Sequence, residues 1–144
     1  MLGARDRFVP GYASGLCFGL DDDAFAAHYA QWAERGFSSA KVKGGLDLDR
    51  DIRRLKIARE VLGRNSARPA LMLDVNECWS RKQAVRHLAE IQQHLDLTWI
   101  EEPVRRWDAD GHAMISRAAH CAVATGENLT GLDQFTPLFD AKAV

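Results

Sequence analysis

The chain has 144 residues, of which 47% are hydrophobic and 27% are charged, and its formal net charge is −1. This length and composition predict one globular domain with a buried core, spanning residues 1–144. The small net charge argues against nucleic acid or a membrane surface as the main partner. We find no long apolar stretch of the kind that forms a signal peptide or a membrane span.

The cysteines and histidines show no metal-binding or disulfide pattern. The three cysteines are an odd number without a Cys-x-x-Cys pair, so we expect free thiols in a reducing cytoplasm. The five histidines fall in predicted helices without ligand spacing, and we expect them to be structural or surface residues. The cysteines are Cys17, Cys78 and Cys121.

Short apolar runs alternate with amphipathic segments, which is typical of parallel β/α units. The first strand is predicted at residues 8–13, although Pro10 weakens a strand interior. Acidic residues 21–23 then cap a helix that ends at Gly36. The second strand is predicted at residues 39–43.

The second strand carries two lysines. Lys41 and Lys43 share one face of it because strand side chains alternate. A helix follows, capped by Asp47 or Asp49, and Gly63 ends it.

The third strand is predicted at residues 70–75. Asp74 and Asn76 fall on the same face of it. Ser80 and Gln83 then match a capping box, which predicts the start of the next helix.

The last predicted strands are residues 98–101, closed by Pro103, and residues 122–126. A helix at residues 111–120 separates them, with Met114, Ile115 and Ala118 facing inward. A further helix begins near Leu132. One face of the last strand is predicted to carry Val123, Thr125 and Glu127.

Five strands are fewer than the eight that close a β/α barrel of about 250 residues. An open sheet of five parallel strands would leave polar groups facing water and two bare edges. We therefore predict an α/β fold that is a partial TIM-type (β/α)8 barrel, with about five of its eight β/α units and without the last strands.

Three acids stand at the ends of successive predicted strands: Asp74, Glu101 and Glu127. The intervals, from 74 to 101 and from 101 to 127, are 27 and 26 residues, about one β/α repeat. Acids at the ends of parallel strands meet at one rim, and their oxygens suit a hard divalent cation. The alternative is that each acid caps the next helix or pairs with an arginine.

The two lysines would face this cation. A nearby divalent cation lowers the pKa of an amine, so one lysine could act as a general base near neutral pH. The other could stay charged and hold a carboxylate. The alternative is a lysine pair that protects an exposed edge strand from aggregation.

Two polar neighbours of the acids leave alternatives open. Asn76 either contacts a substrate hydroxyl or closes a turn. Glu102 points away from Glu101 if the strand continues, so we expect it either to support the metal ligands from behind or to pair with Arg105 or Arg106, rather than to bind metal itself.

Four motifs together resemble the mandelate racemase/muconate lactonizing enzyme family of the enolase superfamily. The resemblance covers nearly the whole chain. The motifs are Lys41-Val42-Lys43, Leu73-Asp74-Val75-Asn76, Trp99-Ile100-Glu101-Glu102-Pro103 and Gly126-Glu127-Asn128.

The resemblance implies catalytic roles for these residues. Asp74, Glu101 and Glu127 would bind Mg²⁺, which stabilises the enediolate formed from the substrate. Lys43 would remove the proton α to the substrate carboxylate. Lys41 would hold that carboxylate, and Asn76 would contact the substrate.

The resemblance also implies a small hydroxy-acid or acid-sugar substrate. We expect an aldonate or aldarate dehydratase; the alternatives are a racemase or epimerase of 2-hydroxy acids, or an inactive β/α module that binds metal or a partner chain. Full family members carry an N-terminal capping domain and a later Asp and His pair. We expect this chain to be a truncated piece without them, with little turnover, which could self-associate or dock with a complementary barrel fragment.

Overall fold

The computed structural model describes residues 9–144, in which five strands and five helices alternate. The strands are β1 (Ala13–Gly15), β2 (Ser39–Lys43), β3 (Ala70–Asp74), β4 (Trp99–Glu101) and β5 (Ala122–Ala124). The helices are α1 (Asp22–Glu34), α2 (Leu48–Leu62), α3 (Arg81–Gln92), α4 (Ala109–Ala118) and α5 (Leu132–Asp140). Within residues 9–144, no helix combines the length and the apolar character that crossing a membrane requires.

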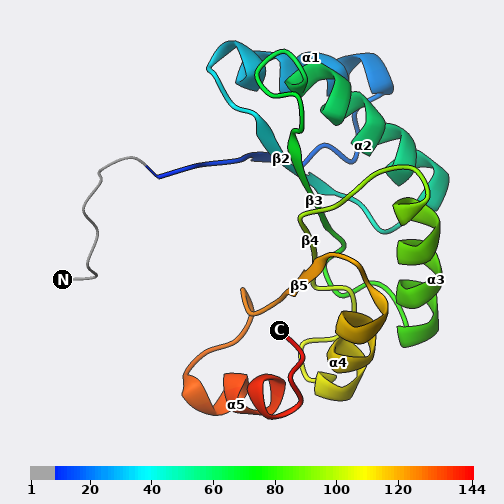
Figure 1. The fold of residues 1–144 in the computed structure, drawn as a ribbon, viewed down its shortest axis with the longest axis vertical. Helices are drawn as coiled ribbons and strands as arrows, with labels where there is room; N and C mark the ends of the chain where they lie inside the picture. Colours follow the sequence, from blue (N-terminus) through cyan, green and yellow to red (C-terminus); the bar gives the residue numbers. More distant parts are fainter. Residues whose placement is uncertain (1–8) are drawn as a thin grey trace.

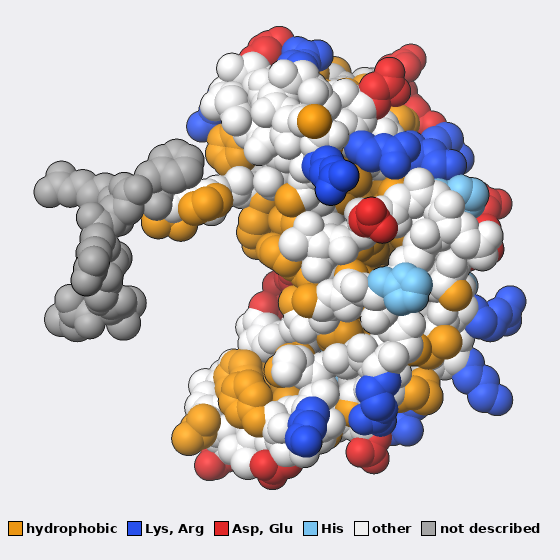
Figure 2. Space-filling view, viewed as in Figure 1, with side chains coloured by type: hydrophobic (Ala, Val, Ile, Leu, Met, Phe, Trp, Pro, Cys, Tyr) orange, Lys and Arg blue, Asp and Glu red, His pale blue; other side chains and the backbone are white. Residues whose placement is uncertain are grey.

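The strands form one parallel sheet in the order β1-β2-β3-β4-β5. Each strand pairs in parallel with the next strand along the chain, which is the arrangement of consecutive units in a β/α barrel. The sheet curves, and α1 to α4 lie along one side of it (Figure 1). In the same view the molecule is hollowed on the side away from α3 (Figure 2). The predicted α/β fold with five barrel units is confirmed.

Polar side chains cap the first turns of α1 to α4. The Asp47 side chain accepts a hydrogen bond from the backbone of Arg50, so Asp47 rather than Asp49 caps α2. The predicted capping box of Ser80 and Gln83 is present at the start of α3. These local signals act over three or four residues, which is why they can be recognised without knowing the fold.

Several element predictions are wrong in their bounds: β3 and β4 are each one residue shorter than predicted, β5 ends two residues earlier, and β1 and α4 are displaced along the chain. The first strand is Ala13–Gly15, and residues 9–12 are not in a strand; Phe8 lies outside the described residues. Pro10 has no N–H to donate to a ladder, which explains the later start. Helix α4 begins two residues earlier than predicted because Asp108 caps it, and Ala118 is exposed rather than inward.

The main core lies between the sheet and α1 to α4. Alternate strand residues point into it, and these are Val42, Leu71, Leu73, Ile100 and Val123. Helix α5 packs on α4 through a second apolar cluster of Ala113, Leu138 and Ala143. The opposite side of the sheet carries the polar residues considered next.

The prediction that Val123 and Glu127 share a face is wrong. Val123 pairs with Ile100 and is 7% exposed in the core. Strand β5 ends at Ala124, and Gly126 has a φ of +127°, a conformation that glycine adopts readily. The alternation of side chains therefore stops before Glu127, which reaches the other side of the sheet.

Candidate metal centre

The strand register brings the charged residues of three strands into one row. Lys43 pairs with Asp74, and Asp74 pairs with Glu101. Paired residues of parallel strands point to the same side of the sheet, so these side chains share its inner face. One carboxylate oxygen from each of Asp74, Glu101 and Glu127 lies within 4.8 Å of the others.

Asp74 is the most buried of the three acids, with 0% of its side chain exposed. Its Oδ2 lies 2.5 Å from the Lys43 amine and 3.3 Å from the Lys41 amine. Its Oδ1 accepts a hydrogen bond from the backbone N–H of Asn76 at 3.1 Å. Both carboxylate oxygens are thus fixed by neighbours from β2 and from the loop after β3.

Glu101 is held at both of its oxygens. Lys41 donates to Oε1 at 2.5 Å, and the indole N–H of Trp99 donates to Oε2 at 2.9 Å. Tyr12 packs edge-on against Trp99, with 5.6 Å between the ring centroids. Trp99 was not predicted as a site residue, although its position two residues before Glu101 places both on one strand face.

Glu127 is the loosely held member of the trio. It is exposed and lies on the loop between β5 and α5. Its Oε1 is 3.5 Å from the side-chain amide of Asn76, and the carbonyl of that amide accepts from Lys43 at 3.2 Å. Asn76 also has a φ of +45°, so its backbone closes a turn while its side chain lies within the cluster. A contact between Asn76 and a substrate stays a prediction.

The two lysines are not on an edge strand, because β2 lies between β1 and β3. Protection of an exposed edge is therefore the wrong explanation for them. Burial lowers the pKa of Lys41, but the hydrogen bond to Glu101 and the charges of Glu101 and Asp74 outweigh it and leave that pKa raised. Lys41 is thus held as an ammonium, the form that can bind a carboxylate.

The expected pairing of Glu102 with an arginine is wrong. Arg105 and Arg106 pair instead with Glu77, and the Arg106 Nε lies 2.6 Å from Glu77 Oε1. Glu77 has a φ of +62°, and this turn brings its carboxylate to the arginines. Burial raises the pKa of Glu77, but the hydrogen bonds from Arg106 and the charges of Arg106 and Arg105 together outweigh it and leave that pKa lowered. A left-handed turn of this kind leaves no clear signal in the sequence.

Glu102 itself turns inward and is 1% exposed. Its Oε1 accepts a hydrogen bond from the side-chain amide of Asn128 at 3.1 Å. Burial raises the pKa of Glu102, the hydrogen bond from Asn128 lowers it, and the negative charges of Glu127, Glu77 and Asp74 raise it further.

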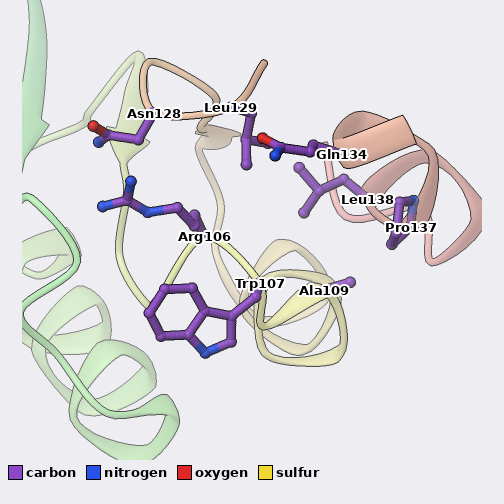
Figure 3. A pocket seen from close by; sticks show the side chains of 8 residues that line it. All are labelled: Arg106, Trp107, Ala109, Asn128, Leu129, Gln134, Pro137 and Leu138. Atoms are coloured by element: carbon purple, nitrogen blue, oxygen red, sulfur yellow. The ribbon is translucent and has the colours of Figure 1, made fainter. Parts of the chain in front are cut away.

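A pocket of about 450 Å³ lies beside the cluster, between α4, α5 and the loops before them. Arg106 and Asn128 reach it from the loops, and in Figure 3 their polar ends point to the same side. Pro137 and Leu138 of α5 form an apolar wall. Asn128 is the link between this pocket and Glu127.

The donor set of the cluster fits Mg²⁺. All three converging groups are carboxylates, the ligands that hard cations prefer. Two lysine amines face these three carboxylates, so the cluster keeps a formal excess of one negative charge. Asp74, Glu101 and Glu127 are the residues that could hold the ion.

Comparisons with known proteins agree with this geometry. The family described as "Enolase C-terminal domain-like" matches residues 24–144. Human "Mitochondrial enolase superfamily member 1" is 35% identical over 139 residues, covering 94% of this chain and 30% of that protein. The "L-talarate/galactarate dehydratase" of Salmonella typhimurium is 39% identical over 106 residues, covering 73% of this chain and 26% of that protein.

A solved structure shows the same fold. The crystal structure of a racemase from Streptomyces coelicolor A3(2) with bound magnesium has a TM-score of 0.84 and 34% identity. The match covers 94% of this chain and 37% of that one. The chain thus spans about a third of the length of these relatives. By fold, by sequence and by the order of its motifs, it belongs to the enolase C-terminal domain-like family of the enolase superfamily.

Proposed function

We propose that this chain, as one domain over residues 1–144, carries the Mg²⁺ site and the base of an acid-sugar dehydratase acting on an aldonate or aldarate. The observation that carries the proposal is the convergence of three carboxylates and two amines at the ends of β2 to β5. The dehydratase relative from Salmonella supports the substrate class, and the magnesium-bound racemase supports the ion.

In this proposal Asp74, Glu101 and Glu127 hold Mg²⁺. Bound there, the ion stabilises the negative charge that develops on the substrate carboxylate when the α-proton leaves. Trp99 holds one oxygen of Glu101 by a hydrogen bond, whereas Asn76 makes only a long contact with Glu127.

Lys43 is the proposed base. Its amine takes the α-proton, the C–H bond breaks, and the electron pair moves toward the carboxylate. The electron pair then returns to form a C=C bond as the C–O bond at the β-carbon breaks, and the hydroxyl leaves as water with the proton that Lys43 took. Lys41, held as an ammonium, binds the substrate carboxylate and offsets its charge.

The racemase relative favours a second candidate, a racemase or epimerase of 2-hydroxy acids. Both reactions begin with the same proton abstraction. They differ afterwards, because racemisation returns a proton to the opposite face of the carbon whereas dehydration expels the β-hydroxyl.

The proposal includes a cytoplasmic location, which the free cysteines support. It also includes association with a second copy or with a complementary β/α fragment. In the part of the chain that the structure describes, β1 and β5 each pair on one side only, and such edges favour further pairing.

Proton exchange tests the proposed function without requiring the complete reaction. The 144-residue chain is incubated in D₂O with Mg²⁺ and galactarate, and loss of the α-proton signal is followed by NMR. We expect slow exchange that Lys43→Ala abolishes and that Asp74→Asn lowers at least about tenfold. The exposed Lys56→Ala is the matched control and should exchange like the parent. Exchange that survives Lys43→Ala, or a parent chain without exchange, contradicts the proposal.

A further inference from the structure

Glu127 differs from the other two acids in how it is supported. Asp74 and Glu101 stand at the ends of paired strands, and lysine amines contact both. Glu127 lies three residues beyond the end of β5 and is exposed. Its contact with Asn76 is long, at 3.5 Å. Something else must fix the loop if this carboxylate is to meet the other two.

Glu102 is connected to the loops on both sides of it. Its backbone N–H donates to the carbonyl of Ala124 at 2.8 Å, and its own carbonyl accepts from the N–H of Glu77 at 2.8 Å. Its carboxylate accepts from Asn128, the neighbour of Glu127, at 3.1 Å. One residue thus fastens the ends of β3 and β5 to the end of β4.

This position is costly to maintain. Glu102 has a φ of +47°, in the left-handed region that side chains disfavour. Its side chain is buried, and its Oε2 has no hydrogen-bond partner within residues 9–144. A buried acid kept in a disfavoured conformation beside a functional cluster points to a role in holding that cluster.

A second contact keeps Glu102 in place. Arg106 donates to Glu77 Oε1 from its backbone N–H at 3.1 Å and from Nε at 2.6 Å. Glu77 follows β3, and Arg106 lies with Glu102 in the loop after β4, so this pair joins the loop that contains Glu102 to the loop after β3. The contact therefore stabilises the loop from which the Glu102 side chain binds Asn128.

We propose that Glu102 is a positioning residue that holds the loop carrying Glu127 by binding the Asn128 side chain, so that Glu127 presents its carboxylate to Mg²⁺. This inference rests on the proposed function, because it presumes that Glu127 is a metal ligand. Glu102 does not touch the ion; it acts through Asn128.

Metal affinity of the 144-residue chain tests the inference, with Mn²⁺ as the probe and free Mn²⁺ measured by electron paramagnetic resonance. We expect Glu102→Ala and Asn128→Ala each to weaken Mn²⁺ binding about tenfold. Because both remove the same hydrogen bond, the double variant should bind no more weakly than the weaker single variant. Glu102→Gln keeps an acceptor oxygen for Asn128 and should restore binding to within about threefold of the parent.

Asn65→Ala is the matched control. The Asn65 side chain donates to the carbonyls of Ala33 at 2.6 Å, in the last turn of α1, and of Phe37 at 2.9 Å, in the loop before β2, at the opposite end of the strands from the cluster. Like Asn128→Ala, the Asn65→Ala variant loses hydrogen bonds that a side-chain amide donates. We expect a lower melting temperature and unchanged Mn²⁺ affinity, which separates positioning from general stability.

The outcomes distinguish this inference from the proposed function. If the parent chain binds no Mn²⁺, both are overturned. If Asp74→Asn abolishes binding while Asn128→Ala leaves it unchanged, the proposed function stands and the positioning role is wrong. Additive losses in the double variant also overturn it. Asn128 is exposed, so its variant keeps the test decisive if Glu102→Ala fails to fold.

Discussion

Asp51 shows how one buried residue can shape the surroundings of the proposed base. It lies on α2 with 1% of its surface exposed, and its Oδ2 accepts from the N–H of Gly45 at 2.6 Å. Gly45 follows Lys43 by two residues, so Asp51 fixes the loop through which β2 continues after the base. Burial raises the pKa of Asp51 to about 6, although the Gly45 hydrogen bond and the charge of Arg50 lower it.

The raised pKa of Asp51 predicts a pH dependence of stability. Between its unfolded value of 3.8 and about 6, the folded chain keeps a proton that the unfolded chain releases. The contribution of Asp51 to the free energy of unfolding is therefore present below pH 4 and is lost as the pH rises through 6, by about 3 kcal/mol. The Asp51→Asn variant cannot lose this contribution, because its side chain does not titrate. The free energy of unfolding of the variant, minus that of the parent chain, should therefore rise by about 3 kcal/mol between pH 4 and 7.

Urea titrations of both proteins at several pH values measure this difference. The exposed Asp49→Asn removes the same charge from the same helix and serves as the control. A difference between Asp51→Asn and the parent that stays constant, or falls, with pH would show that Asp51 does not keep its proton in the folded chain.

Single residues were predictable where strand alternation and register govern them. Asp74 and Glu101 converge as expected because both stand at strand ends in register. The pairing of Glu102 was predicted wrongly and Glu77 was not predicted at all, since both adopt left-handed conformations that alternation does not describe. The contacts of Glu77 with arginines from another loop depend on tertiary packing.

At the scale of elements, the loop between β2 and α2 contains a glycine, Gly45, that combines a left-handed backbone with close packing. Gly45 has a φ of +100°, and a Cβ there would lie 2.5 Å from the Cys78 sulfur and 2.7 Å from the Val75 Cβ. Its carbonyl accepts from the Trp79 indole at 2.8 Å. The loop after β2 is thus packed closely against the loop after β3.

A graded glycine series tests this packing. Gly45→Ala should lower the free energy of unfolding by about 3 kcal/mol, because it combines a disfavoured φ with overpacking. Gly36 has a φ of +89° but open space around its Cβ position, so Gly36→Ala should cost only about 1 kcal/mol. Gly19 has neither constraint, and Gly19→Ala should be nearly neutral. Urea unfolding gives the order, and equal losses at Gly45 and Gly19 would contradict this account.

Elements with strong local signals were predicted closely. Strand β2 has the expected bounds, and α3 begins at the expected cap. Strand β1 was misplaced because it has only three residues and its pairing with β2, rather than its own composition, defines it. A strand this short has too few alternating polar and apolar side chains for its ends to be predicted.

At the scale of the whole molecule, the five-unit arrangement followed from the alternating pattern alone, since consecutive parallel strands require crossover helices. Predicting which side chains meet across the sheet would have required the strand register. Strands β2, β3 and β4 are paired on both sides, whereas in the described residues β1 and β5 are paired on one side only.

This topology predicts uneven protection from hydrogen exchange. Amides of β2 and β3 should exchange at least about tenfold more slowly than those of β1 and β5, because edge strands open without unfolding the core. Native-state exchange followed by NMR measures this. Uniform protection across all five strands would mean that the edges are covered in solution, for example by a second copy of the chain.

The charged cluster is spread over the whole stretch from Lys41 to Glu127, with contributions from β2, β3, β4 and the loop after β5. A break between α3 and β4 would leave Asp74 on one piece and the other two acids on the second. Neither piece alone would keep the trio. Residues 41–127 are therefore the shortest continuous stretch of chain that holds every member of the cluster.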